Sequence, residues 1–294
     1  MSKWFTHLKL YRRLNLRVTY KTLSPLRIGS SKGKSLFSPV DLQVIRIMLN
    51  GRETPYIPGS SLKGVFRSIV ETLLKSYSGL GACDMGQCSN ERGGGDGDTR
   101  DKRLQDAVKE YNNGNLDAKQ KIIDILNEYC LACKIFGSNT YASHIIFTDA
   151  YPLGNVSIGV KTGIAINRRS GAAKGGALYQ VEFVNPGSVF QGLITLINPP
   201  NYVTGLILHV IENIINRSMV RIGGFKSRGF GNVNINIEGI DGMVIDDSKL
   251  KYIKVGDELK TLDEYDTNVR IVEKHELIKE FIRVWDEYVS KHAC

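Results

Sequence analysis

Four of the five cysteines occur in two close pairs, and this spacing constrains the fold more than any other feature of the sequence. Four residues separate Cys83 from Cys88, two separate Cys130 from Cys133, and 41 residues lie between the pairs. Two close thiol pairs are the ligand set of a tetrahedral zinc site, which requires the two segments to meet in space. We therefore predict one structural zinc ion bound by these four cysteines, with His144 as a substitute ligand. The alternatives are a redox pair and a chance CxxC, because CxxC alone is not specific for zinc.

The cysteines also indicate the compartment. Their number is odd and they are clustered rather than spread, which argues against the disulfide framework of a secreted protein. The N-terminal region lacks the apolar run of a signal peptide, and no stretch approaches the roughly 20 apolar residues of a membrane span. We expect a soluble, cytoplasmic protein with no membrane contact.

The charge is distributed unevenly along the chain, which carries a net charge of +9. Residues 1–80 hold 14 Lys and Arg against three acids, and residues 161–228 hold eight against two. Residues 241–294 reverse the balance, with nine basic against 13 acidic residues. A basic body favours a polyanionic partner, most often nucleic acid, over the alternative of ordinary solubility charge.

Hydrophobic residues make up 42% of the chain, enough for a sizeable core, and their periodicity predicts alternating strands and helices. Strand patterns cover residues 15–28, the segments HIIFTDAYP and GLITLI, and VNINIEGI, while helical patterns cover residues 65–77 and 203–217. Their order is that of an α+β fold of ferredoxin-like or RRM-like type, βαββαβ. We predict one such domain over residues 1–294, with three additions: a zinc-binding helical insertion over 79–135, a long β-hairpin over 156–190 and a C-terminal extension over 241–294.

The segment GSSLKGVFRS, residues 59–68, places small residues at a predicted helix start. Amide groups at a helix N-terminus, together with cations one turn apart on one face, form a site for anions. Ser60 and Ser61 would supply the helix start, and Lys63 and Arg67 the cations. The alternative is a capped surface helix whose Lys and Arg are solvated.

The segment GGFKSRGFGNV, residues 223–233, combines four glycines with two cations and two aromatic residues. Glycine allows the backbone to approach a ligand closely. Phe225 and Phe230 could stack on bases while Lys226 and Arg228 contact phosphates. The alternative is a tight turn whose phenylalanines belong to the core.

Two glycine-containing segments resemble nucleotide-binding motifs but do not match them. GSSKGKS, residues 29–35, has three residues between its glycines where a P-loop has four, and it does not lead into a helix. GGFKSRGFG precedes a predicted strand, whereas a Rossmann fingerprint opens a helix. We also find no Ser–His–Asp or Cys–His grouping in the sequence.

Five segments together resemble the RAMP superfamily of CRISPR effector complexes. They are SPLRIG, SPVDLQVIR, YIPGSSLKGVFRS, CLACKIFGS and GGFKSRGFGNV, and their order and spacing span residues 23–235. The chain is most similar to the Csm-type backbone subunit of type III complexes, with the equivalent Cmr-type subunit as the second choice.

The resemblance implies an RRM-like palm that assembles with further copies of itself into a filament along CRISPR RNA, together with other type III subunits. The hairpin over 156–190 would be a thumb that separates the guide from the target RNA. The helix start and the glycine loop would grip the guide backbone. The residues assigned to RNA binding are Ser60, Ser61, Lys63, Arg67, Arg168, Arg169, Lys174, Gly223, Gly224, Lys226 and Arg228.

The resemblance also implies a metal-dependent endoribonuclease that cleaves guide-paired target RNA in antiviral defence. Asp41, in PVDLQVIR, matches the catalytic aspartate of Csm-type subunits and is the only acid among the first 52 residues. A carboxylate in a basic surface can bind Mg²⁺ or another divalent metal beside a phosphate. It would orient the ribose 2′-OH for attack on the adjacent phosphodiester. The alternative is that Asp41 caps a turn.

Two functions therefore remain open: a guide-RNA-binding subunit that also cuts target RNA, and an RNA-binding scaffold subunit without chemistry. A stand-alone RNA-processing endonuclease of the same superfamily would need a histidine as general acid or base. No histidine falls in a matching motif.

Overall fold

The computed structural model of the chain describes all residues except 1–3, 30–39, 84–87, 89–98, 247–248 and 293–294. Its centre is a six-stranded antiparallel sheet in the order β10-β9-β1-β8-β4, with β5 paired to β8 beyond this path. The strands are β1 (Arg12–Thr22), β4 (Ile145–Phe147), β5 (Tyr151–Pro152), β8 (Val189–Ile197), β9 (Val233–Asp246) and β10 (Lys249–Tyr252).

Strand β1 is the middle of this sheet and shows why the sequence folds this way. Its side chains alternate between buried and more exposed positions, as expected of a strand with one face on the core. Leu14, Leu16, Val18 and Tyr20 are almost completely buried. The predicted first strand therefore exists, although it begins and ends earlier than residues 15–28.

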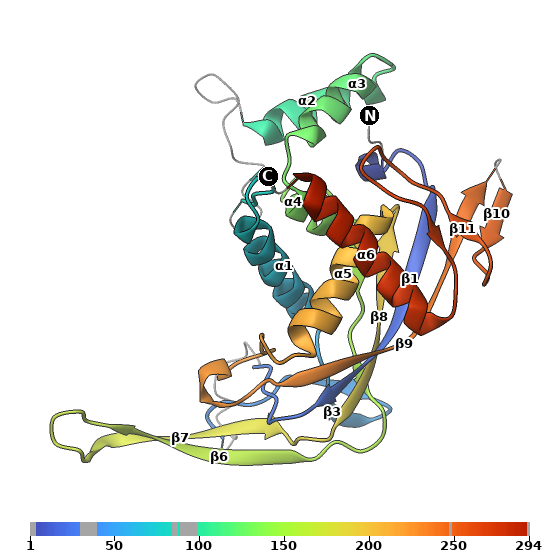
Figure 1. Cartoon of the computed structure of the whole chain (residues 1–294). Coiled ribbons are helices and arrows are strands. Elements are labelled where there is room, and N and C mark those ends of the chain that lie inside the picture. The colour runs from blue at the N-terminus through green and yellow to red at the C-terminus, as the bar shows by residue number, and fades with distance from the viewer. Residues whose placement is uncertain (1–3, 30–39, 84–87, 89–98, 247–248, 293–294) are drawn as a thin grey trace.

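Helices α1 (Gly59–Ser76) and α5 (Asn201–His209) alternate with the strands in the order β1, α1, β4, β8, α5, β9. They gather with α6 (Lys274–His292) on one side of the sheet (Figure 1). The mixture of strands and helices expected of the predicted α+β class is thus confirmed. The helix predicted over 203–217 is α5 continued by a π-helical turn, η3 (Val210–Ile215).

Two additions lie at opposite ends of the molecule (Figure 1). Between α1 and β4, the chain forms α2 (Arg100–Asn112), α3 (Ala118–Asn127) and α4 (Leu131–Phe136). The break between α2 and α3 includes Gly114, which adopts a φ of +93°. At the other end, β6 (Ile158–Ile166) and β7 (Ala173–Val184) form the predicted hairpin, which projects from the body.

The described part of the C-terminal segment, residues 241–246 and 249–292, packs against the body through α6 and Asp266. Helix α6 lies against α5 so closely that a Cβ atom on Gly205 would collide with the carbonyl oxygen of Phe281. The guanidinium of Arg12 in β1 lies 3.6 Å from the Asp266 carboxylate, and both side chains are buried.

No described helix is both long and apolar enough to span a membrane. The remaining short elements are η1 (Trp4–Thr6), β2 (Arg46–Leu49), β3 (Arg52–Pro55), η4 (Lys226–Arg228), β11 (Glu258–Leu259) and β12 (Val269–Arg270).

Candidate nucleic-acid interface and metal centre

A groove of about 430 Å³ lies between the start of α1 and the loop before β9. Two segments far apart in the sequence, which the resemblance assigns to one grip on the guide RNA, thereby lie side by side. Of the residues predicted to bind RNA, the groove is lined by Ser60, Ser61, Gly223, Gly224 and Lys226.

The start of α1 is fixed by residues that the sequence analysis did not assign. Pro58 is the N-cap, with an extended backbone, and the Asp149 carboxylate accepts the N–H of Gly59 at 2.8 Å. A Cβ atom on Gly59 would collide with the carbonyl oxygen of Phe147. Ser60 and Ser61 therefore lie inside the first turn, where they face the groove, and neither is the N-cap.

The glycine loop is held against β1's continuation by backbone contacts. Gly223 has a φ of +85°, and a Cβ atom there would collide with the carbonyl oxygen of Arg27. The N–H of Gly224 donates to that same oxygen at 2.8 Å, and the N–H of Gly231 donates to Pro25 at 2.8 Å. The loop can lie this close only because its glycines have no side chains. Lys226, which follows them, is exposed and lines the groove.

Gly64 is the most informative residue of the groove. It occupies the interior of α1, is exposed, and lines the groove. No atom lies within 4 Å of the position a Cβ would take, so packing within the chain does not require glycine here. Glycine in a helix interior costs about 1 kcal/mol relative to alanine. A groove that must admit another molecule's backbone would explain that cost.

Arg228 connects the glycine loop to the projecting hairpin. Its guanidinium donates to the Tyr179 hydroxyl of β7 at 2.6 Å and lies 4.9 Å from the ring centroid of Phe225. The Arg27 guanidinium also lies over this ring, at 5.5 Å. Phe230 is buried, which agrees with the alternative that this phenylalanine belongs to the core. The loop therefore turns Lys226 to the groove and Arg228 to the hairpin.

The hairpin tip exposes Arg168 and Arg169. The side chain of Lys174, the third cation predicted there, lies outside what the structure describes. Exposed apolar side chains also follow the hairpin, including Val160, Ile164 and Leu178. An isolated two-stranded hairpin that exposes such residues gains stability when another surface covers it.

Asp41 lies beside the same hairpin. Its Oδ2 accepts the N–H of Gln180 at 2.9 Å, and Leu42 forms a parallel bridge with Val181. Glu182 of β7 then accepts the N–H of Val44 at 3.1 Å and the Arg46 guanidinium at 2.8 Å. The segment that carries Asp41 is thus fixed to the base of the hairpin.

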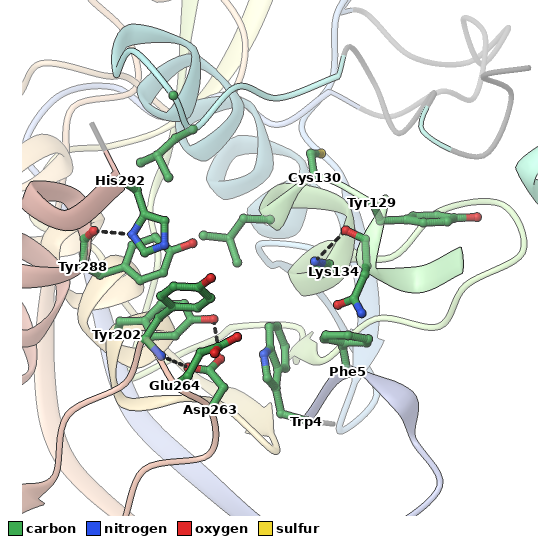
Figure 2. A pocket seen from close by; sticks show the side chains of 15 residues that line it. Trp4, Phe5, Tyr129, Cys130, Lys134, Tyr202, Asp263, Glu264, Tyr288 and His292 are labelled. Atoms are coloured by element: carbon green, nitrogen blue, oxygen red, sulfur yellow. Dashed lines mark hydrogen bonds between the residues drawn. The ribbon is translucent and has the colours of Figure 1, made fainter. Parts of the chain in front are cut away.

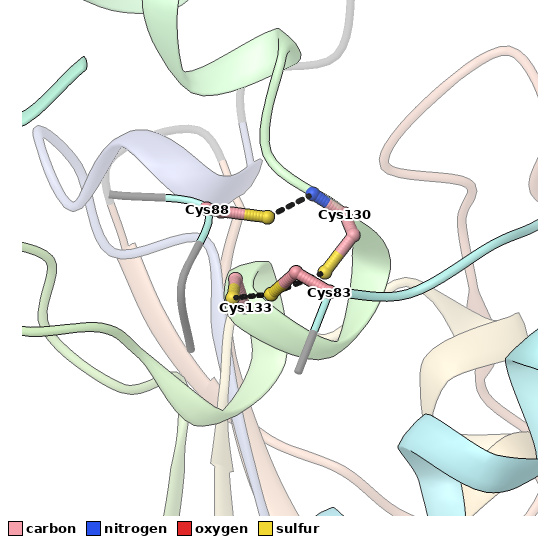
Figure 3. Close-up of side chains that lie close together, drawn as sticks. All are labelled: Cys83, Cys88, Cys130 and Cys133. Carbon is pink, nitrogen blue, oxygen red and sulfur yellow. Dashed lines mark hydrogen bonds between the residues drawn. The ribbon is translucent and has the colours of Figure 1, made fainter. Parts of the chain in front are cut away.

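The four paired cysteines meet in one cluster (Figure 3). Their sulfur atoms all lie within 4.8 Å of one another; Cys83 is 3.3 Å from Cys133 and 3.7 Å from Cys130. Four sulfurs at 2.3 Å from a tetrahedral zinc ion lie about 3.8 Å apart, so the cluster fits such an ion. Because the thiols of Cys133 and Cys88 donate to its sulfur, the pKa of Cys130 is well below the usual thiol value.

His144 does not join the cluster. Its Nδ1 lies 2.8 Å from the carbonyl oxygen of Ile197, and its ring stacks on His7 at 3.7 Å. Burial, reinforced by the neighbouring His7, lowers the pKa of His144 to about 4. His144 is therefore a packing residue, and the prediction of it as a substitute ligand is wrong.

Lys63 and Arg67 lie on α1 but not among the residues that line the groove. The Arg67 side chain points to the cysteine cluster and to Glu71. Burial alone would lower the pKa of Arg67, but the hydrogen bond to Glu71 and the nearby Cys133 raise it. Burial and the charge of Arg67 lower the pKa of Lys63.

A second cavity of about 430 Å³ lies next to the cluster, with Cys130 in its wall (Figure 2). Its polar groups bond to neighbouring groups of the chain. The Tyr202 hydroxyl donates to Asp263 at 2.9 Å, and the Lys134 ammonium donates to the carbonyl oxygen of Asn127 at 3.2 Å. This cavity is a junction between α4, α5, α6 and the loop around Asp263.

Three residues that shape the groove were not predicted from the sequence: Arg27, Gly64 and Asp149. Arg27 lies in the SPLRIG motif and Gly64 in GSSLKG, so both were quoted without a role. A glycine inside a predicted helix was a signal that could have identified Gly64. Asp149 follows β4 and carries no local signal, because only the fold brings it to α1.

The family model of the RAMP superfamily matches residues 19–234, which is more than half of the chain. The match covers both segments of the groove, the cysteine cluster and the hairpin. No curated protein matches the chain.

Proposed function

Because this chain belongs to the RAMP superfamily, whose members are generally CRISPR-associated RNA-binding proteins, we propose that it is a backbone subunit of a type III CRISPR complex. In this proposal, the subunit binds CRISPR RNA in the groove, assembles with further copies into a filament, and cleaves guide-paired target RNA. The fold would act as an RRM-like palm, and the chain would be a subunit of the Csm type.

The glycine-lined groove carries this proposal, and Gly64 above all. Glycines on both walls would admit the sugar–phosphate backbone, and Lys226, Ser60 and Ser61 line the groove beside it. Contacts of this kind read phosphates rather than bases, so binding would tolerate any guide sequence and weaken as salt increases.

The projecting hairpin would act as the thumb between guide and target. The cations at its tip and the exposed apolar side chains along it suit contacts with phosphates and with base faces. Arg228 joins the hairpin to the glycine loop, which would keep the thumb in register with the guide.

Asp41 would be the catalytic residue, and a divalent metal such as Mg²⁺ would supply charge neutralisation at the scissile phosphate. Asp41 would orient the ribose 2′-OH toward the adjacent phosphodiester. Attack by that oxygen expels the 5′-oxygen and leaves a cyclic phosphate and a 5′-hydroxyl. One Asp41 in each filament subunit would give cuts at a regular interval.

The second candidate is a scaffold subunit without chemistry. The hydrogen bond from Gln180 to the Asp41 carboxylate supports it, because that bond already gives Asp41 a structural role. The two candidates agree on RNA binding and differ only in cleavage.

The test compares target binding and target cleavage by two complexes reconstituted with guide RNA and labelled target RNA. One contains the wild-type chain and the other contains Asp41→Ala. We expect the variant to bind target with unchanged or slightly higher affinity, since a negative charge leaves a basic surface, while cleavage falls by a factor of about 100 or more. Asp41→Asn is the matched control, because it keeps an acceptor for Gln180 without the charge. Equal cutting by Asp41→Ala would contradict the catalytic role, and a wild-type complex that binds target without cutting would favour the scaffold.

A further inference from the structure

Arg67 lies about one turn beyond Gly64 on α1, yet its guanidinium bonds to groups outside the groove. Its Nε donates to the Glu71 carboxylate at 2.7 Å, and its Nη1 donates to the carbonyl oxygen of Gly137 at 3.0 Å. Its Nη2 donates to the sulfur of Cys133 at 3.5 Å. The Arg67 side chain is 20% exposed, and Cys133 is completely buried.

These three bonds use the fork geometry of the guanidinium. Glu71 is on the same helix and Gly137 ends α4, so the first two bonds hold the planar group between two elements. The remaining edge can then face only the cysteine cluster. Lysine could not replace this arrangement, because an ammonium lacks the rigid planar fork.

A sulfur atom attracts such a donor most strongly when it is a thiolate. Four thiolates around one Zn²⁺ carry a formal charge of −2, and two of the four cysteines, Cys88 and Cys133, are buried. Donors to the ligands of a metal orient those ligands and tune metal affinity. A neutral disulfide between two of these cysteines would give the guanidinium no comparable partner.

We propose that Arg67 is a positioning residue of the metal centre, which holds Cys133 by an N–H to sulfur hydrogen bond and offsets the charge of the metal–thiolate cluster. The motif that carries Arg67 predicted an RNA contact, and the geometry points to a different task. The inference goes beyond the proposed function, since it depends on metal binding and not on RNA.

This assignment makes α1 a shared element. Ser60, Ser61 and Gly64 face the groove, and Arg67 faces the cluster on the next turn. Lys63, four residues before Arg67 and on the same face, has a charge but is not bonded to a cysteine among the described contacts. It is therefore the matched control for the effect of charge alone.

The experiment measures zinc affinity by competition with a chromophoric chelator for the full-length wild type, Arg67→Ala, Arg67→Lys and Lys63→Ala. We expect both Arg67 variants to lose about tenfold to hundredfold in zinc affinity, the usual effect of removing an outer ligand partner. Lys63→Ala should retain wild-type zinc affinity. Circular dichroism identifies any variant that fails to fold, and Glu71→Gln shows what loss of the intrahelical ion pair does on its own.

Cobalt substitution provides a second readout that does not depend on RNA. Four-thiolate Co²⁺ gives sulfur-to-metal charge-transfer bands, and loss of the Arg67 bond should shift or weaken them in Arg67→Lys while the helix content stays constant. Zinc affinity and cobalt spectra unchanged in both Arg67 variants would overturn the proposal, as would a wild type that binds neither metal. RNA affinity measured in parallel separates this result from the proposed function, because only that affinity reports on the groove.

Discussion

The groove and the cysteine cluster share helix α1 but are built from opposite kinds of residue. The groove depends on what is missing: Gly64, Gly223 and Gly224 leave the backbone bare, and Lys226 is exposed. The cluster depends on four side chains of one type, two of which, Cys88 and Cys133, are buried. The ligands of a metal site are side chains, so their spacing in the sequence can identify the site. A groove that binds a ligand through bare backbone is recognised only when the fold brings its glycines together.

The largest expected effect lies at the cluster. Cys133→Ser removes one ligand, so the metal content should fall from about one zinc per chain to near zero; structural zinc contributes apparent binding free energies of about 10–16 kcal/mol in small zinc domains. Elemental analysis of freshly purified, chelator-free protein measures this. Cys294→Ser is the control and should keep its zinc. RNA affinity should change far less than zinc content, and an equal loss of both would show that the two regions are not separable.

The buried His144 should make the stability of the fold respond to pH. His144 has a pKa of about 4 in the folded chain and about 6.5 when unfolded, so the unfolded state binds more protons between these values. Stability is therefore complete above about pH 6.5 and falls by about 3 kcal/mol as the pH drops through 4.

Urea unfolding at pH 7, 5.5 and 4.5 tests this in the metal-free Cys133→Ser background, where acid release of zinc cannot contribute. His144→Gln should show a shallower loss of stability with acid than its parent. Parallel pH profiles for the two proteins would contradict the assigned role of His144 and leave other groups responsible.

At the groove, the expected effect is on affinity and its salt dependence. Lys226→Ala should remove about one phosphate contact, and the slope of log affinity against log salt should fall by about one. Fluorescence anisotropy with a labelled guide RNA measures this over a salt series. An unchanged slope would exclude the Lys226 side chain from phosphate contact, while the zinc content should stay at the wild-type level in either case.

The smallest expected effect separates folding from binding at one residue. Gly64→Ala should raise the free energy of unfolding by about 1 kcal/mol, since alanine is the better helix former and its Cβ meets no atom of the chain. RNA affinity should nevertheless fall, because the methyl group enters the groove. Thermal unfolding and RNA titration on the same preparation decide this. A stabilised variant with full RNA affinity would remove the strongest support for the groove.

The sequence predicted the strands, the helices and the meeting of the four cysteines, because these follow from periodicity and from side-chain chemistry. It did not predict the direction of Arg67. The spacing of Lys63 and Arg67 indicates that they share a helix face, but the rotation of α1 about its axis is set by packing against α4 and the sheet. Asp149 was missed for a related reason, since its contact with Gly59 joins residues that only the folded sheet brings together.

The position of β1 at the middle of the sheet has a consequence for synthesis. Its two neighbours, β8 and β9, emerge from the ribosome long after it, and at about 5–20 residues per second the wait for β9 is tens of seconds. During that time, β1 has two open edges and an apolar face that other nascent chains could pair with. The carbonyl oxygen of Arg27 likewise has no Gly224 N–H to accept until residue 224 has been synthesised, so the groove cannot form before then. A ribosome-bound chain therefore cannot capture RNA early, and a chain truncated before β9 should be captured by chaperones or aggregate.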